Sequence, residues 1–148
     1  MFRRLFHALL ALLFSLPLCA EVVNIDNAEL AHLVAAGVPV VDIRTEGEWK
    51  ETGVVPGSKL LTFYDERGRS DPPAWLQKVQ AIARPDQPVI VICRSGNRTR
   101  DASRFLAQQA GYTKVYNVRD GIRSWAKDGR PLVPMETAAV GCPAGGHC

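Results

Sequence analysis

The chain has 148 residues, of which 47% are hydrophobic and 22% are charged, and its formal net charge is +3. This balance is typical of one globular domain, and it excludes a collagen-like repeat or a largely disordered chain. So small an excess of positive charge does not by itself indicate binding to nucleic acid.

The first twenty residues have the pattern of a secretory signal peptide. Arg3 and Arg4 precede an apolar run over residues 8–18, and the first acidic residue of the chain is Glu21. The run is too short for a permanent membrane-spanning helix, which needs about 20 apolar residues. We therefore expect residues 1–20 to be cleaved and the protein to be periplasmic or secreted. An uncleaved anchor and a lipoprotein modified at Cys19 are the alternatives.

Short apolar runs then alternate with segments of helical spacing. In chain order the pattern predicts strand 22–25, a helix from 27 to near 37, strand 38–43, helix 45–51, strand 60–63, helix 72–83, strand 88–92, helix 97–110, strand 115–118 and helix 121–127. This alternation predicts an α/β fold with an open, mainly parallel β-sheet and helices on both faces. We assign the domain to residues 21–130 and a Cys/Gly-rich C-terminal tail to residues 131–148.

Cys93 directly follows the most strand-like segment, at the edge of the sheet where parallel α/β proteins bind ligands. A Gly-containing turn at 93–98 (CRSGNR) allows successive backbone N–H groups to point at one centre. The following helix dipole, Arg94 and Arg98 add positive charge. These features favour a thiolate and predict a nucleophile. A buried structural cysteine is the alternative.

The chain resembles the single-domain rhodaneses, which are thiosulfate sulfurtransferases, of the exported bacterial type. The resemblance covers residues 25–130 and rests on three ordered motifs. The first is the loop CRSGNR at 93–98. The second lies upstream and consists of VDIR at 41–44, EW at 48–49 and GVVPGS at 53–58. The third is the closing segment, with GY at 111–112, residues 115–121 and Trp125.

Two departures from the family pattern concern packing and not the proposed chemistry. Val54 and Val55 stand where the family usually has His-Ile, and Asp120-Gly121 stands where it usually has a Gly pair. The resemblance implies that the expected open, mainly parallel sheet has the rhodanese-like fold.

The resemblance also implies covalent sulfur transfer that needs no cofactor and no metal. Cys93 would take the outer sulfur of thiosulfate or a similar anionic donor as a persulfide. Cyanide, a thiol or a protein acceptor would then remove it. The substrate-binding residues would be Arg94, Ser95, Gly96, Asn97 and Arg98. Arg98 would either steer the anion or bind a carboxylate beneath the loop.

Asp42 and Arg44 follow a neighbouring strand and are predicted to support the loop, as a structural ion pair or a loop anchor. Glu48 is expected to be a helix-start charge. Trp49 and Trp125 are expected to be packing aromatics. The only histidines beyond the leader are His32 and His147, and neither is predicted to assist Cys93.

Two other functions fit parts of the loop. A non-enzymatic sulfur carrier would hold the same Cys93 persulfide for a partner protein. A cysteine phosphatase or arsenate reductase would need five residues between the cysteine and the arginine, whereas four separate Cys93 from Arg98.

The tail holds Cys142 and Cys148 in a segment rich in Gly and Pro. We expect a local disulfide, which stabilises little because the loop it closes is short. One of the two could instead resolve the Cys93 persulfide, or both could bind a soft metal ion with His147. No nucleic-acid partner and no stable membrane span of the mature chain are expected.

Overall fold

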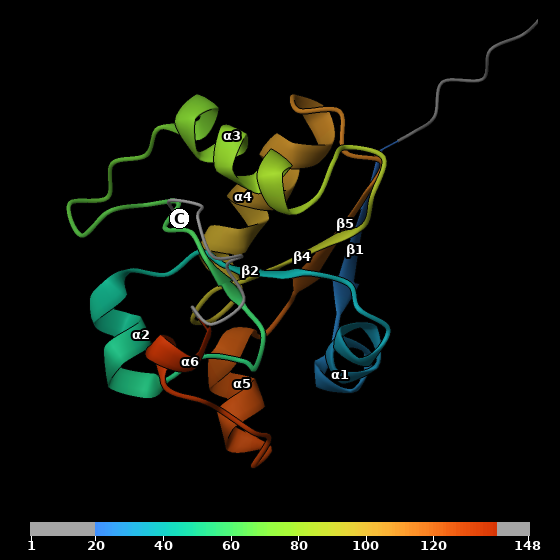
Figure 1. Cartoon of the computed structure of the whole chain (residues 1–148). Coiled ribbons are helices and arrows are strands. Elements are labelled where there is room, and N and C mark those ends of the chain that lie inside the picture. Colours follow the sequence, from blue (N-terminus) through green and yellow to red (C-terminus); the bar gives the residue numbers. More distant parts are fainter. Residues whose placement is uncertain (1–19, 139–148) are drawn as a thin grey trace, which may run out of the picture.

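The structure is a computed structural model that describes residues 20–138 (Figure 1). Its elements are β1 (Glu21–Ile25), α1 (Asn27–Ala35), β2 (Val40–Asp42), α2 (Glu46–Thr52), β3 (Lys59–Leu60), α3 (Pro72–Ile82), β4 (Val89–Ile92), α4 (Asn97–Gln108), β5 (Lys114–Val118), α5 (Gly121–Lys127) and α6 (Met135–Ala138). The alternation predicted from the sequence is confirmed along the domain. The predicted helices and strands differ from the observed ones by a few residues at their ends.

The five strands form one parallel sheet in the order β1-β5-β4-β2-β3. The central strand β4 is an unbroken apolar run, which is typical of a strand covered on both faces. Val89 and Val91 pack under α3 and α4, whereas Ile90 and Ile92 pack on α1 and α5. Figure 1 shows α3 and α4 on one face of the sheet and the other helices on the opposite face. The α/β fold expected from the sequence is thus confirmed.

The predicted strand 60–63 is shorter in the structure, where β3 covers Lys59–Leu60. The N–H of Leu61 still donates to the carbonyl of Asp42, and that of Phe63 donates to Ile43. From the first of these hydrogen bonds to the second, the β3 segment moves on by two residues, whereas the β2 segment moves on by only one. This mismatch breaks the regular ladder.

A buried ion pair joins the end of β2 to the end of α2. The guanidinium of Arg44 donates to both carboxylate oxygens of Asp42, with a shortest distance of 2.7 Å. It also donates to Thr52 Oγ1 at 2.6 Å and to the Gly53 carbonyl at 2.8 Å. Because Asp42 is fully buried and Arg44 is 1% exposed, these contacts replace water around both charges.

The first residues of the assigned tail pack against the domain. Val133 forms an antiparallel bridge with Val54, and Ala138 of α6 lies in a small core with Trp49. The proposed disulfide and the alternative metal site at Cys142, His147 and Cys148 lie outside the described residues. Among residues 20–138, no helix is long and apolar enough to cross a bilayer.

The buried pair makes a prediction about stability. Replacing Arg44 with Gln should lower the free energy of unfolding by about 3–5 kcal/mol, because it leaves the Asp42 carboxylate buried without its ionic partner. Urea unfolding measures this change. The control is Arg84→Gln, which removes an ion pair to Asp86 that is about 70% exposed on both sides and should cost less than about 1 kcal/mol. Equal losses in the two variants would contradict the role assigned to burial.

Candidate active site

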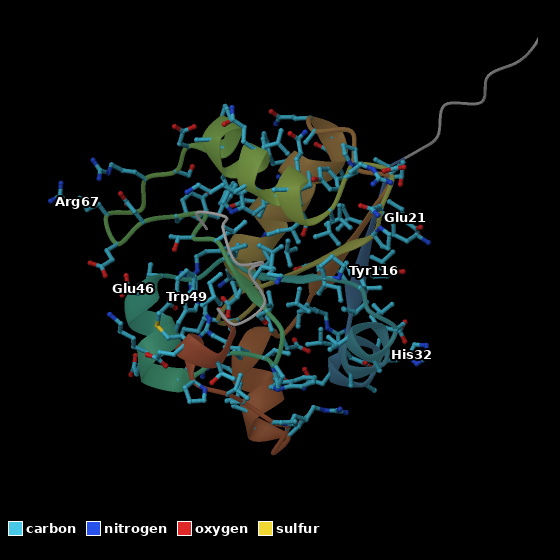
Figure 2. All side chains as sticks on the ribbon, in the orientation of Figure 1. Glu21, His32, Glu46, Trp49, Arg67 and Tyr116 are labelled. Carbon is cyan, nitrogen blue, oxygen red and sulfur yellow. The ribbon has the colours of Figure 1, made fainter. Side chains whose placement is uncertain are left out.

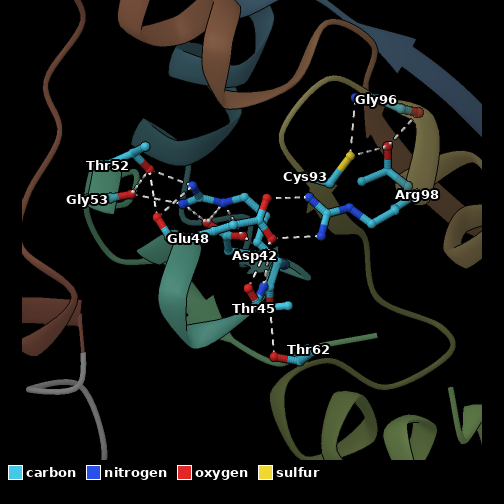
Figure 3. Close-up of polar contacts among 11 residues, drawn as sticks. Asp42, Thr45, Glu48, Thr52, Gly53, Thr62, Cys93, Gly96 and Arg98 are labelled. Carbon is cyan, nitrogen blue, oxygen red and sulfur yellow. Dashed lines mark hydrogen bonds and ion pairs between the residues drawn. The ribbon is translucent and has the colours of Figure 1, made fainter. Parts of the chain in front are cut away.

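Cys93 follows β4 at the carboxyl edge of the sheet and is the first residue of the 93–98 loop (Figure 3). The N–H of Gly96 donates to its Sγ at 3.2 Å. The thiol lies 3.7 Å from the hydroxyl oxygen of Thr99, and that hydroxyl donates to the Gly96 carbonyl at 3.1 Å. Because Cys93 is 1% exposed, only a slender group could reach its sulfur in this conformation.

The first turn of α5 binds the outer side of the loop. The N–H of Ile122 donates to the carbonyl of Cys93 at 2.8 Å, and the N–H of Arg123 donates to that of Arg94 at 3.2 Å. The first N–H groups of a helix have no partner inside the helix, so they are free to bind these carbonyls. With its carbonyls turned toward α5, the loop can present an amide to the sulfur.

Two glycines allow the loop to lie directly on the chain before α5. Gly96 has a φ of +87°, and a Cβ there would overlap the Arg119 carbonyl. Gly121 has a φ of +66°, and a Cβ there would overlap the backbone of Arg94. Gly121 belongs to the Asp120-Gly121 pair that departs from the usual sequence. Of these two positions, the one that contacts the loop is Gly121, and it is still a glycine in this chain.

Arg98 binds a carboxylate beside the loop, as one of the two sequence-based interpretations expected. Its guanidinium donates to both oxygens of Glu48, at 2.8 and 2.6 Å. The hydrogen bonds from Arg98 lower the pKa of Glu48 to about 2. The same hydrogen bonds raise the pKa of Arg98, to which the charges of Cys93 and Asp42 also contribute. Figure 3 shows this pair between Cys93 and α2.

The remaining predicted site residues separate into two groups. Arg94, Ser95 and Asn97 are exposed on the loop, where they can meet a ligand from solvent. Asp42 and Arg44 instead form the ion pair that holds the end of α2, the helix that carries Glu48, so they support the loop through that helix. The charge of Asp42 also helps to raise the pKa of Arg98.

Sequence reasoning missed two contributors to the site. Thr99 was not singled out, although it is fully buried and lies beside the sulfur; its place in the first turn of α4 was the available signal. Glu48 was interpreted only as a helix-start charge. Its side chain does accept the Thr45 N–H at 3.0 Å, but it also anchors Arg98, fifty positions away. His32 is exposed on α1, apart from the loop (Figure 2).

A cysteine loop at the carboxyl edge of a parallel sheet lies where α/β proteins bind their ligands, and a thiol is a side chain that can act as a nucleophile. The family model of the rhodanese-like domain matches residues 26–128, and the chain belongs to this family. A sulfurtransferase of Allochromatium vinosum is 36% identical over 116 residues, which cover 76% of this chain and 96% of the relative. Thiosulfate sulfurtransferase 18 of Arabidopsis thaliana is 29% identical and is covered to 84% of its length.

Solved structures show the same fold. The crystal structure of Rv0390 from M. tuberculosis has a TM-score of 0.63 at 24% identity, covering 78% of this chain and 98% of that one. A rhodanese-related protein from Thermoplasma volcanium has a TM-score of 0.56 at 28% identity, with 75% and 97% covered. The rhodanese-like sheet implied by the sequence is therefore confirmed.

The contact at Gly96 makes a second prediction. Gly96→Ala should lower the free energy of unfolding by about 2–5 kcal/mol, because it adds a clash with the Arg119 carbonyl to the strain of a positive φ. Gly129→Ala is the matched control: its φ is +67° but a Cβ there would meet no atom within 4 Å, so it should cost only about 1–2 kcal/mol. Chemical denaturation measures both changes. If Gly96→Ala costs no more than the control, the close approach does not constrain the loop.

The lowered pKa of Glu48 makes a third prediction, about acid stability. Glu48→Gln keeps the side chain's size but should lose about 1 kcal/mol at neutral pH, because the pair with Arg98 is partly exposed. A lowered carboxyl pKa stabilises the folded state above the unfolded value of 4.5. The difference between wild type and variant should therefore shrink as pH falls from 4.5 toward 2.

Urea unfolding across this pH range measures that difference. Glu46→Gln is the control, since Glu46 is exposed on the same helical turn and, within residues 20–138, forms an ion pair only with the exposed Lys50. It should show a smaller difference at every pH. A Glu48→Gln difference that stays constant down to pH 2 would contradict the assigned stabilisation.

Proposed function

We propose that the protein is a rhodanese-type sulfurtransferase that carries a sulfane sulfur as a persulfide on Cys93. The observation that carries the proposal is the position of the Cys93 sulfur, enclosed by its loop, beside the Gly96 N–H and the Thr99 hydroxyl. The family and the sulfurtransferase names of its relatives support the same reaction class.

In the first step the Cys93 thiolate attacks the outer sulfur of the donor. With thiosulfate, a new S–S bond forms at Cys93 while the donor's S–S bond breaks, and sulfite leaves with that electron pair. The product is a Cys93 persulfide with its negative charge on the outer sulfur. The Gly96 amide and the N-terminus of α4 stabilise negative charge at this end of the loop.

In the second step an acceptor attacks the outer sulfur of the persulfide. Cyanide becomes thiocyanate, or a thiolate becomes a persulfide, and in both cases Cys93 leaves as a thiolate ready for another donor. Covalent catalysis of this kind divides one difficult transfer into two easier ones. The exposed Arg94 can attract an anionic donor, whereas Arg98 is already bound to Glu48 and positions the loop.

The same pairing argues against a phosphatase or arsenate reductase. Such enzymes need an arginine free to bind the oxyanion, and in this chain both terminal nitrogens of Arg98 donate to Glu48. One structural neighbour is named a possible tyrosine phosphatase, but at 24% identity the likeness shows the fold alone.

We also propose that the protein is exported, with residues 1–20 removed as a signal and the domain beginning near Glu21. The support is the basic and apolar pattern of the leader and the change of composition that follows it. An extracytoplasmic thiol enzyme would meet inorganic sulfur anions as donors.

The fourth prediction tests the persulfide. Wild type treated with thiosulfate should gain the mass of about one sulfur atom, a reversible thiol modification. Cyanide should remove the added sulfur as thiocyanate. Cys93→Ser should gain no sulfur, because it lacks the thiol. Intact-mass spectrometry checks each result. A folded, reduced wild type that gains no mass would exclude thiosulfate as the donor.

Turnover distinguishes an enzyme from a sulfur carrier. An enzyme forms many equivalents of thiocyanate per protein when thiosulfate and cyanide are both in excess, whereas a carrier that gives its sulfur only to a partner protein forms less than one. Colorimetric detection of thiocyanate over time gives this ratio. Less than one equivalent from a protein that thiosulfate does load would replace catalysis with the carrier function.

A further inference from the structure

A groove lies between α4 and the edge strand β1, and it ends at the active-site loop without including Cys93. Its volume is about 580 Å³, and Cys93 is not among the residues that line it. Side chains of β1 and β5 form the floor, α4 forms one wall, and Ser95, Gly96 and Asn97 close one end. Figure 1 shows β1 at the edge of the sheet beside β5.

The wall and end of the groove are positively charged. Arg100 and Arg104 project from α4 with the spacing of one helical turn, and Arg119 follows β5. All three are exposed, and none of the described residues that line the groove is an aspartate or glutamate. The only ion pair that any of the three forms within residues 20–138 joins Arg119 to Asp120 at 3.4 Å. The groove therefore favours an anionic ligand.

The floor contains a buried acceptor without a partner. Asn117 is 7% exposed, and its Nδ2 donates to Asn24 Oδ1 at 2.8 Å. Its own Oδ1 has no hydrogen-bond partner among the described residues. Successive side chains of a strand point to opposite faces of the sheet. Val118 faces α1 and α5, so Asn117 faces α4, on the side where the groove lies. A buried acceptor of this kind is satisfied by a ligand that brings an N–H or O–H group.

The dimensions of the groove indicate an extended chain. Its floor includes Val22 and Asn24 of β1, and its wall follows α4 from Asn97 to Gln108, which is about 16 Å of helix. An extended peptide of five or six residues has this length, and it supplies a backbone N–H donor at every residue. Acidic side chains on the same peptide would meet the arginines.

We propose that this groove binds an acidic, extended peptide segment of a partner protein. The segment's carboxylates would pair with Arg100 and Arg104, and a backbone N–H would reach Asn117. This chain does not supply the segment from residues 1–19 or 139–148, because neither stretch contains Asp or Glu. Because the groove ends on residues 95–97, a bound partner would lie beside the loop that holds Cys93.

The experiment measures fluorescence anisotropy of a labelled six-residue peptide of alternating Glu and Asp. We expect saturable binding to the purified protein, about tenfold weaker binding in Arg100→Gln and in Arg104→Gln, and unchanged binding in Arg67→Gln. Arg67 is the matched control, since it is an exposed arginine on the loop before α3, away from the groove (Figure 2). All three arginines are exposed, so the substitutions should leave the melting temperature unchanged.

Four further results decide the proposal. The matching peptide of Gln and Asn should bind at least tenfold more weakly, which would support recognition of the carboxylates. Equal weakening by Arg67→Gln, or no saturable binding by wild type up to millimolar peptide, would overturn the groove as the site. If citrate displaces the peptide with a dissociation constant equal to that of the peptide, the groove is a site for small anions, and this result would overturn the peptide assignment.

The binding measurement is independent of sulfur transfer. Cys93→Ser should bind the acidic peptide as tightly as wild type, because Cys93 does not line the groove. Loss of binding in Cys93→Ser would contradict a groove that does not include Cys93. A failure of thiosulfate loading would leave the peptide result unaffected, so the two proposals can fail separately.

Discussion

The site depends on the close contact between the backbone of the cysteine loop and the chain that enters α5. No side chain fits between them at Gly96 or at Gly121. At that distance the first amides of α5 bind the carbonyls of Cys93 and Arg94, which fixes the outer side of the loop. The inner side can then present the Gly96 amide to the sulfur. The sulfur environment thus comes from backbone packing more than from charged side chains.

Two ion pairs extend this constraint across the sheet. Asp42 and Arg44 fix the end of α2, and Glu48 on that helix holds Arg98 of the loop. The buried pair is costly to break, because either partner alone would be a charge without water. The partly exposed Glu48–Arg98 pair is weaker but acts directly on the loop. Arg98 therefore has a positioning role, which leaves Arg94 as the loop's exposed cation.

The α4 helix connects the two proposed functions. Its first turn places Thr99 beside Cys93, while Arg100 and Arg104 line the groove over β1. Helical geometry separates neighbouring residues by about 100°, so adjacent positions can serve different faces. A partner held on one face and a persulfide held at the end of the same helix would then lie close together.

The parallel α/β fold could be predicted from the residue pattern, because apolar runs and helical periods alternate along the domain. The sequence also identified Cys93, since a thiol that follows the strongest strand and opens a Gly-containing loop is well placed to act as a nucleophile. It did not reveal that Glu48 holds Arg98, that Thr99 reaches the sulfur, or that the side-chain oxygen of Asn117 has no partner in the described part of the chain. Those features join residues from separate elements, and only the tertiary structure brings them together. Local spacing determines the strands and helices, whereas contacts between distant residues depend on how these elements pack.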